Sequence, residues 1–240
     1  AYMRTGDNVT AVNELNSIVG DHPDYLPAHM ALARQAFQTR DFKTAAEHAA
    51  IARRLAPQNY DADSLYVRSQ LQLLASGDSA MADLSLAELE TQIAELEKHP
   101  AGALQTGLMK FSVALGKAEY KAAEKILSRL KKDHAENVKV SMAFAELYAA
   151  RDMKEKAISV LNEIIEQFPQ EREPVQFLAS VHAFDDQRDE SRRVLEEAID
   201  RLGNRDDKLE LALMLADFFR QWQMQDERYE ILNSFAAEYS

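Results

Sequence analysis

Histidine and carboxylate side chains are the groups in this chain that could do chemistry, because they transfer protons and bind metal ions near neutral pH. The six histidines are scattered along the sequence, and none forms the HExxH pair that places two zinc ligands on one helical face. The densest acidic cluster runs from Asp185 to Glu190. We interpret it as a turn followed by a helix start, where carboxylates complement the helix dipole. The sequence therefore predicts no metal site.

Recognisable catalytic motifs are also missing from the sequence. There is no GxGxxG, phosphate-binding loop, GxSxG or calcium loop, and the chain has only 7 glycines with which to build a backbone cradle. The absence of cysteine excludes a cysteine nucleophile and a thiolate metal site. We predict that the protein is not an enzyme, and that it has no catalytic residue and no cofactor.

The charge of the chain bears on its partners. The formal charge is -12 over 240 residues, which repels phosphate backbones and anionic lipid surfaces. No apolar run approaches the roughly 20 residues that a membrane-spanning helix needs. We therefore expect a protein or peptide partner, with no nucleic acid and no direct insertion into a membrane.

Helices joined by short turns are predicted by the composition, which has few Gly and Pro and abundant Ala, Leu, Glu and Lys. Residues that break helices recur at a nearly constant interval: Pro23 and Pro57 lie 34 residues apart, and the next boundaries, Pro100, Ala135, Pro169 and Gly203, follow at spacings of 43, 35, 34 and 34 residues. Such a period is typical of a repeat array of helix pairs. It predicts a partial repeat at 1–25 and further repeats at 26–59, 60–102, 103–137, 138–171, 172–205 and 206–240.

One interval is longer than the others. It contains the polar stretch from Ala75 to Asp83, around Gly77, which we interpret as an enlarged turn between two helices. Ser85 and Glu88 follow with the spacing of a capping box, so a helix is expected to begin there. The insertion lengthens one repeat without ending the array.

The residues between the boundaries carry a family resemblance. Before Pro57, Leu32 and Ala33 occupy the leucine-small pair of the first helix, while Ala45, Ala49 and Ala52 occupy the small positions of the second. Similar copies include Phe144-Ala145 with Ala157, Leu161 and Pro169, and Leu178-Ala179 with Leu195 and Ala198. The chain resembles the tetratricopeptide repeat family over nearly its whole length. The resemblance implies an all-α, right-handed solenoid of antiparallel helix pairs, with about six repeats in one array.

A partner-binding surface follows from the same resemblance. In tetratricopeptide arrays the first helix of each pair lines the concave surface, which grips a peptide or a helix of another protein. Carrying the helical phase across gives thirteen candidates on the first helices: Met30, Arg34, Phe37, Gln38, Ser64, Arg68, Leu71, Phe111, Met142, Glu146, Gln176, Ser180 and Phe184. Apolar members would give adaptable contacts, and Arg34 and Arg68 would hold carboxylates of the partner.

The leading hypothesis is thus a non-catalytic scaffold, and two alternatives stay open. The array could be a structural module that self-associates within a larger protein, or, less favoured, an RNA-binding helical repeat, which would need a basic groove. The first copy lacks most of its first helix, so we expect the chain to be a fragment of a longer protein. A weaker similarity to bacterial envelope and exopolysaccharide-associated tetratricopeptide proteins slightly favours a periplasmic or envelope location over a cytoplasmic one.

Overall fold

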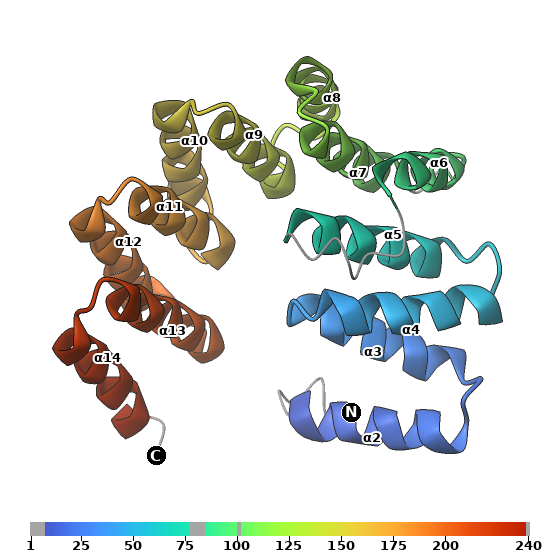
Figure 1. The fold of residues 1–240 in the computed structure, drawn as a ribbon, viewed down its shortest axis with the longest axis horizontal. Helices are drawn as coiled ribbons and strands as arrows, with labels where there is room; N and C mark the ends of the chain where they lie inside the picture. The colour runs from blue at the N-terminus through green and yellow to red at the C-terminus, as the bar shows by residue number, and fades with distance from the viewer. Residues whose placement is uncertain (1–7, 77–84, 100–101, 239–240) are drawn as a thin grey trace. The chain divides into compact units, whose positions relative to one another are not determined.

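The computed structural model of the chain describes residues 8–76, 85–99 and 102–238. Within these ranges it contains thirteen helices and no strand, so the all-α prediction is confirmed. Each helix packs against its neighbours in the sequence, which is the arrangement of an α-solenoid (Figure 1). None of the helices described is both long enough and apolar enough to span a bilayer. The partial first helix before Asn8 and most of the enlarged turn around Gly77 fall outside the described residues.

The chain divides into two compact units, the first ending at Ile126 and the second beginning at Leu127. In the first unit α3 packs on α2 and α4, and α5 packs on α4, α6 and α7. Its helices are α2 (Asn8–Asp21), α3 (Leu26–Gln38), α4 (Phe42–Leu55), α5 (Tyr60–Ala75), α6 (Leu86–Leu96) and α7 (Ala103–Gly116). The boundary between the units lies within α8 (Tyr120–Asp133).

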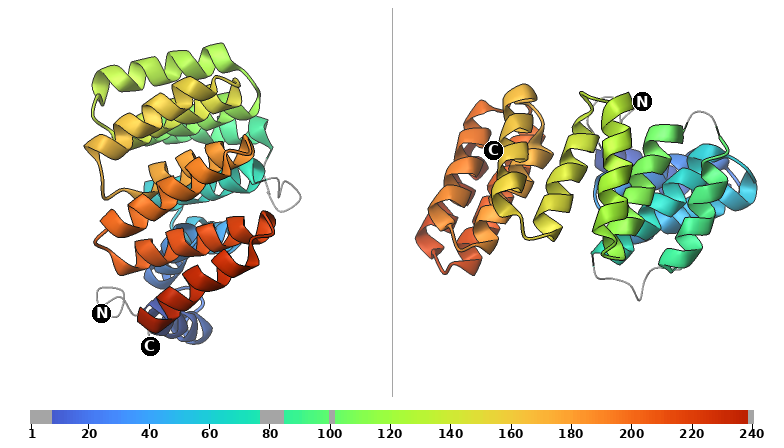
Figure 2. Two further views of the ribbon diagram at one scale, coloured as in Figure 1. Left: turned by 90° about the vertical axis from the view of Figure 1, so that its left-hand side faces the viewer. Right: turned by 90° about the horizontal axis from the view of Figure 1, so that it is seen from above.

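The second unit contains three further helix pairs, drawn from yellow to red in Figure 2. They are α9 (Val138–Ala150) with α10 (Lys154–Gln167), α11 (Arg172–Phe184) with α12 (Arg188–Arg201), and α13 (Arg205–Gln221) with α14 (Gln225–Glu238). Each pair packs on the next, because α10 contacts α11 and α12 contacts α13. A direct contact between the first helices α11 and α13 continues the stack.

The turn inside five of the pairs has one backbone geometry. The first residue after the C-cap of the first helix adopts a positive φ, at Arg40, Ala118, Asp152, Asp186 and Gln223. The next amide then donates to a carbonyl five residues earlier, as Asp41 N does to Ala36 O at 2.8 Å and Glu119 N does to Ala114 O at 2.8 Å. This pattern is the Schellman motif, which satisfies the last carbonyls of a helix and reverses the chain over very few residues. It explains why the two helices of a pair lie antiparallel and side by side.

Small side chains set the distance between the helices of a pair. Ala33, Ala45, Ala145 and Ala157 are all fully buried, which confirms their predicted role as small contacts. Larger side chains fill the remaining space, among them Leu161 and Leu195, which are also fully buried. The helices therefore approach closely where alanine recurs, and leucine packs the layers between them.

Helix starts agree with the sequence where it carries capping signals. Ser85 and Glu88 form the predicted capping box: the Glu88 carboxylate accepts from Ser85 N at 2.8 Å, and Ser85 Oγ accepts from Glu88 N at 3.4 Å. Asn59 caps α5 by accepting a hydrogen bond from Ala62 N at 3.1 Å. These contacts satisfy amides that have no partner inside their helix, so they define where α5 and α6 begin.

Candidate partner-binding surface

Four of the thirteen candidate residues lie in the interior. Met30, Ser64, Leu71 and Phe111 are 7%, 4%, 7% and 1% exposed, respectively. Met30 packs with Ala52 and Ala62, and Leu71 packs with Val67, Leu89 and Ile93. Their predicted exposure is corrected because a first helix is covered on more than one side: α3, for example, contacts α2, α4 and α5. The candidate surface is therefore drawn from the other nine residues.

In the first unit, α3 and α5 bring Phe37 and Arg68 together. The guanidinium carbon of Arg68 lies 4.2 Å from the centroid of the Phe37 ring, which is a cation–π contact. Phe37 in turn packs edge-on against Phe42 at 5.4 Å between centroids, so its ring is held in place. Burial lowers the pKa of Arg68, with Tyr60 acting in the opposite direction. Arg68 is thus a partly desolvated cation on a fixed aromatic face.

Arg34 and Gln38 lie farther out on α3, where both side chains are exposed. Arg34 Nη2 lies 3.3 Å from Asp61 Oδ2, so this arginine already has a carboxylate within the chain. Both partners are more than half exposed, and surface pairs of this kind contribute little stability. Arg68, by contrast, has no ion pair with any residue that the structure describes.

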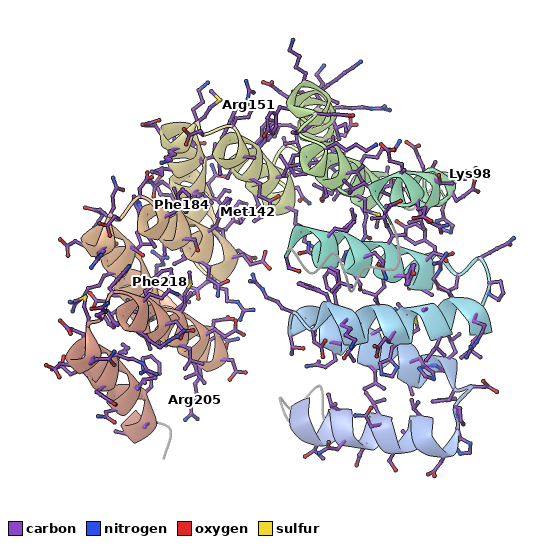
Figure 3. The ribbon with its side chains drawn as sticks, viewed as in Figure 1. Lys98, Met142, Arg151, Phe184, Arg205 and Phe218 are labelled. Atoms are coloured by element: carbon purple, nitrogen blue, oxygen red, sulfur yellow. The ribbon has the colours of Figure 1, made fainter. Side chains whose placement is uncertain are left out.

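In the second unit, α9 carries Met142 and Glu146 (Figure 3). Met142 is half-buried against the cluster of Ala145 and Leu161. Glu146 is exposed to solvent yet crowded by the surrounding protein, and it has no ion pair among the described residues. Loss of hydration, followed by repulsion from Glu173, raises the pKa of Glu146 to about 7. A carboxylate in this setting is stabilised by a cation.

The remaining three candidates lie on α11. Gln176 is half-buried, and its carbonyl oxygen accepts a hydrogen bond from Ser180 Oγ at 2.8 Å. Phe184, the last residue of α11, is 86% exposed. Lys154 Nζ lies 5.8 Å from the centroid of its ring and also pairs with Asp185. Phe184 is therefore an uncovered aromatic ring beside a charged pair.

The structure also contains a groove that was not predicted from the sequence. A hollow of about 270 Å³ in the second unit is lined by Lys131, Ser141, Phe144, Tyr148, Val160, Glu163, Ile164 and Gln167. Lys131 Nζ donates to Ser141 Oγ at 3.3 Å across it. Phe144 and Tyr148 have the spacing i, i+4, which indicates that they share one face of α9. In the sequence both residues count only as repeat positions, although this spacing is a signal that could have indicated a shared surface.

Two histidines form a contact that spacing alone did not predict. His29 Nδ1 and His48 Nδ1 are 2.9 Å apart, and His29 Nε2 lies 2.9 Å from Pro23 O. Because a carbonyl only accepts, His29 Nε2 carries the hydrogen, and a neutral His29 accepts at Nδ1 from His48 Nδ1–H. His29 is 1% exposed, so this is a buried structural link between α3 and α4. No three His, Asp or Glu side chains among the described residues are grouped to hold a metal ion.

Comparison with known proteins gives a family match and several matches in fold. The tetratricopeptide repeat family matches residues 142–171, which lie in α9, α10 and the turns around them. A tetratricopeptide repeat protein from Parabacteroides merdae ATCC 43184 superposes with a TM-score of 0.56 at 13% identity, covering 98% of this chain and 88% of its own. A thermophilic protein of the same class from Thermus thermophilus gives 0.59 at 16% identity, covering 81% and 98%.

A third solved structure, PilW, is described as a widely conserved type IV pilus biogenesis factor. It gives a TM-score of 0.55 at 14% identity, covering 91% of this chain and 89% of its own. At these identities the likeness concerns the fold alone. No curated protein sequence matches the chain.

Proposed function

We propose that this chain, which contains a tetratricopeptide repeat and has the fold of tetratricopeptide repeat proteins, is a non-catalytic scaffold that binds a segment of another protein on its first helices. Repeat arrays of this kind expose a long row of side chains without a closed pocket, which suits the binding of an extended segment or a helix. In the second unit, the exposed members of that row include Glu146, Ser180 and Phe184.

The observation that carries the proposal is the state of Arg68. The chain has 40 acidic residues against 28 Lys and Arg, yet this arginine has no carboxylate partner among the described residues. An unpaired guanidinium that has lost part of its hydration is stabilised by a carboxylate brought by a partner. Its position over Phe37 keeps the guanidinium plane on an aromatic face and so limits the entropy lost on binding.

The chemistry of the partner segment follows from the neighbours of Arg68. Phe37 offers apolar surface directly beside the cation, so the preferred segment carries an Asp, a Glu or a terminal carboxylate next to an apolar side chain. Arg34 contributes less, because it would have to release Asp61 before binding another carboxylate. Self-association remains a separate prediction, which the mass of the protein in solution would test.

Selection of peptides from a displayed random library on the immobilised protein tests the proposal. We expect enrichment of sequences that combine a carboxylate with an adjacent apolar residue. Selection in parallel on the Arg68→Gln variant, with circular dichroism as a check on folding, should lose that consensus. Absence of any enrichment over an unrelated immobilised helical protein would argue against a peptide-binding scaffold.

A further inference from the structure

A second charged surface lies on α8, apart from the first helices. Its exposed side chains include Lys121, Lys125, Arg129 and Lys132, which are spaced at i, i+4, i+8 and i+11. With 3.6 residues per turn, this spacing places all four on one face of the helix, with successive positions about 5 to 6 Å apart along the axis. We call these four residues the basic stripe. They share one continuous helix, so their arrangement follows from α8 alone.

The opposite face of α8 is buried. Ala123, Leu127 and Leu130 are fully or almost fully covered, and they repeat at i, i+4 and i+7. The basic stripe is therefore directed away from the core, and Figure 3 shows side chains with nitrogen at their ends projecting from this helix. The stripe is an outer surface that packing within the chain does not use.

The charges of the stripe are not compensated. None of its four residues has an ion pair or a hydrogen bond to another side chain in the described part of the chain. Lys121 with Lys125 and Lys125 with Arg129 are like charges at i, i+4, and such pairs destabilise a helix. The helix has five basic and two acidic residues, in a chain whose formal charge is -12.

Another second helix of the array balances its cations internally. In α12, Arg193 pairs with Glu190 at 2.6 Å and with Glu197 at 3.2 Å. Arg192 pairs with Glu196 at 2.8 Å in the same helix. These exposed cations on α12 thus have carboxylates one turn away, whereas the basic stripe has none among the described residues. The contrast indicates that repulsion along α8 serves something other than the fold.

We propose that the basic stripe of α8 docks an acidic segment of a partner protein, at a site distinct from the first helices. Charge complementarity selects the occupant: carboxylates repeated about every 6 Å, as on a helix with Glu at i and i+4, match the spacing of the stripe. A long polyanion fits less well, because it extends beyond the stripe onto a chain that is strongly acidic elsewhere. A short acidic segment confines its charge to the four cations.

Binding of defined probes tests this assignment. The main probe is a short fluorescent peptide with glutamate at i and i+4 in an alanine background, and the same peptide with glutamine in place of glutamate is its control. A single-stranded oligonucleotide and vesicles of phosphatidylglycerol represent the two polyanionic alternatives. Fluorescence anisotropy and co-sedimentation report binding by the full chain.

Two charge-reversed variants separate the stripe from the net charge. Lys125→Glu with Arg129→Glu changes the stripe, while Lys43→Glu with Arg54→Glu changes two exposed residues of α4, unpaired within the described structure, by the same total charge. Both variants should fold, since all four side chains are exposed, and a glutamate at position 125 would gain a favourable neighbour in Lys121. Circular dichroism checks this for each protein.

We expect the glutamate peptide to bind the wild type and the α4 variant equally, and to bind the α8 variant about tenfold more weakly. Binding should also weaken at high salt, because the contacts are exposed. Equal losses in both variants would show an effect of net charge alone and would overturn the proposal. It would also be overturned if the oligonucleotide or the vesicles, and not the glutamate peptide, depended on the stripe.

Discussion

The guanidinium of Arg68 lies 4.2 Å from the centroid of the Phe37 ring, and the two side chains come from the first helices of successive pairs, α5 and α3. The contact holds a partly desolvated cation between two repeats, where the sequence alone places two arginines of equal standing. The structure separates them, because Arg34 is paired with Asp61, whereas Arg68 has no such pair among the described residues. The binding hypothesis therefore centres on Arg68 and Phe37.

The repeated turn geometry predicts a stabilising substitution at Ala118. This residue has φ 57°, a conformation in which an alanine Cβ crowds the backbone. We expect Ala118→Gly to raise the free energy of unfolding by about 0.5 to 1 kcal/mol, measured by urea denaturation. Ala122→Gly, at an exposed position inside the adjacent helix α8, should instead lower it by about the same amount. A loss of stability at Ala118 would contradict the assigned turn.

A close contact predicts that Gly102, the N-cap of α7, cannot be replaced freely. A Cβ at this position would collide with the ring and the hydroxyl of Tyr60. We expect Gly102→Ala to cost about 1 to 3 kcal/mol, which thermal or urea unfolding would measure. Gly20→Ala is the matched control, because no atom lies within 4 Å of its Cβ, and it should be neutral or stabilising. Equal effects of the two substitutions would rule out the contact with Tyr60.

The pair of His29 and His48 predicts a dependence of stability on pH. Burial lowers the pKa of His48, the nearby His29 lowers it further, and Glu47 opposes the change. The unfolded chain therefore binds a proton at a higher pH than the folded chain does. The stabilisation is fully present above the ordinary histidine pKa of 6.5 and is lost as the pH falls through the lowered pKa.

Urea unfolding of the wild type and of His48→Gln from about pH 8 to about pH 5 isolates this effect from other titrations. Glutamine keeps an N–H group that can donate to His29 Nδ1. The stability of the wild type should fall more steeply on acidification than that of the variant. Parallel curves would mean that the histidine pair does not titrate differently in the folded and unfolded chains.

Much of the fold could be predicted from the sequence because its signals are local. The proline interval and the alanines at helix contacts, such as Ala45 and Ala157, report a packing distance that repeats along the array. The capping box of Ser85 and Glu88 also acts within a single turn. Such features need no knowledge of which other helix lies nearby.

The binding surface was less accessible to prediction because it depends on how many neighbours cover each helix. In α5, nine residues are buried, so the apolar period does not separate an outer strip from the contacts between repeats. Leu71 was assigned to the surface and is instead core, since α6 and α7 cover that side of α5. The cation–π contact of Arg68 and the groove beside Phe144 also emerged only from contacts between helices.

Titration of a selected peptide against Arg68→Gln, with Arg54→Gln as the control, tests the central claim most directly. Both substitutions remove one positive charge, but Arg54 is an exposed residue of α4, a second helix. Isothermal titration calorimetry should show at least about tenfold weaker binding for Arg68→Gln, with unchanged binding for Arg54→Gln. Equal affinities of both variants and the wild type, with folding intact, would contradict a partner site on the first helices at Arg68.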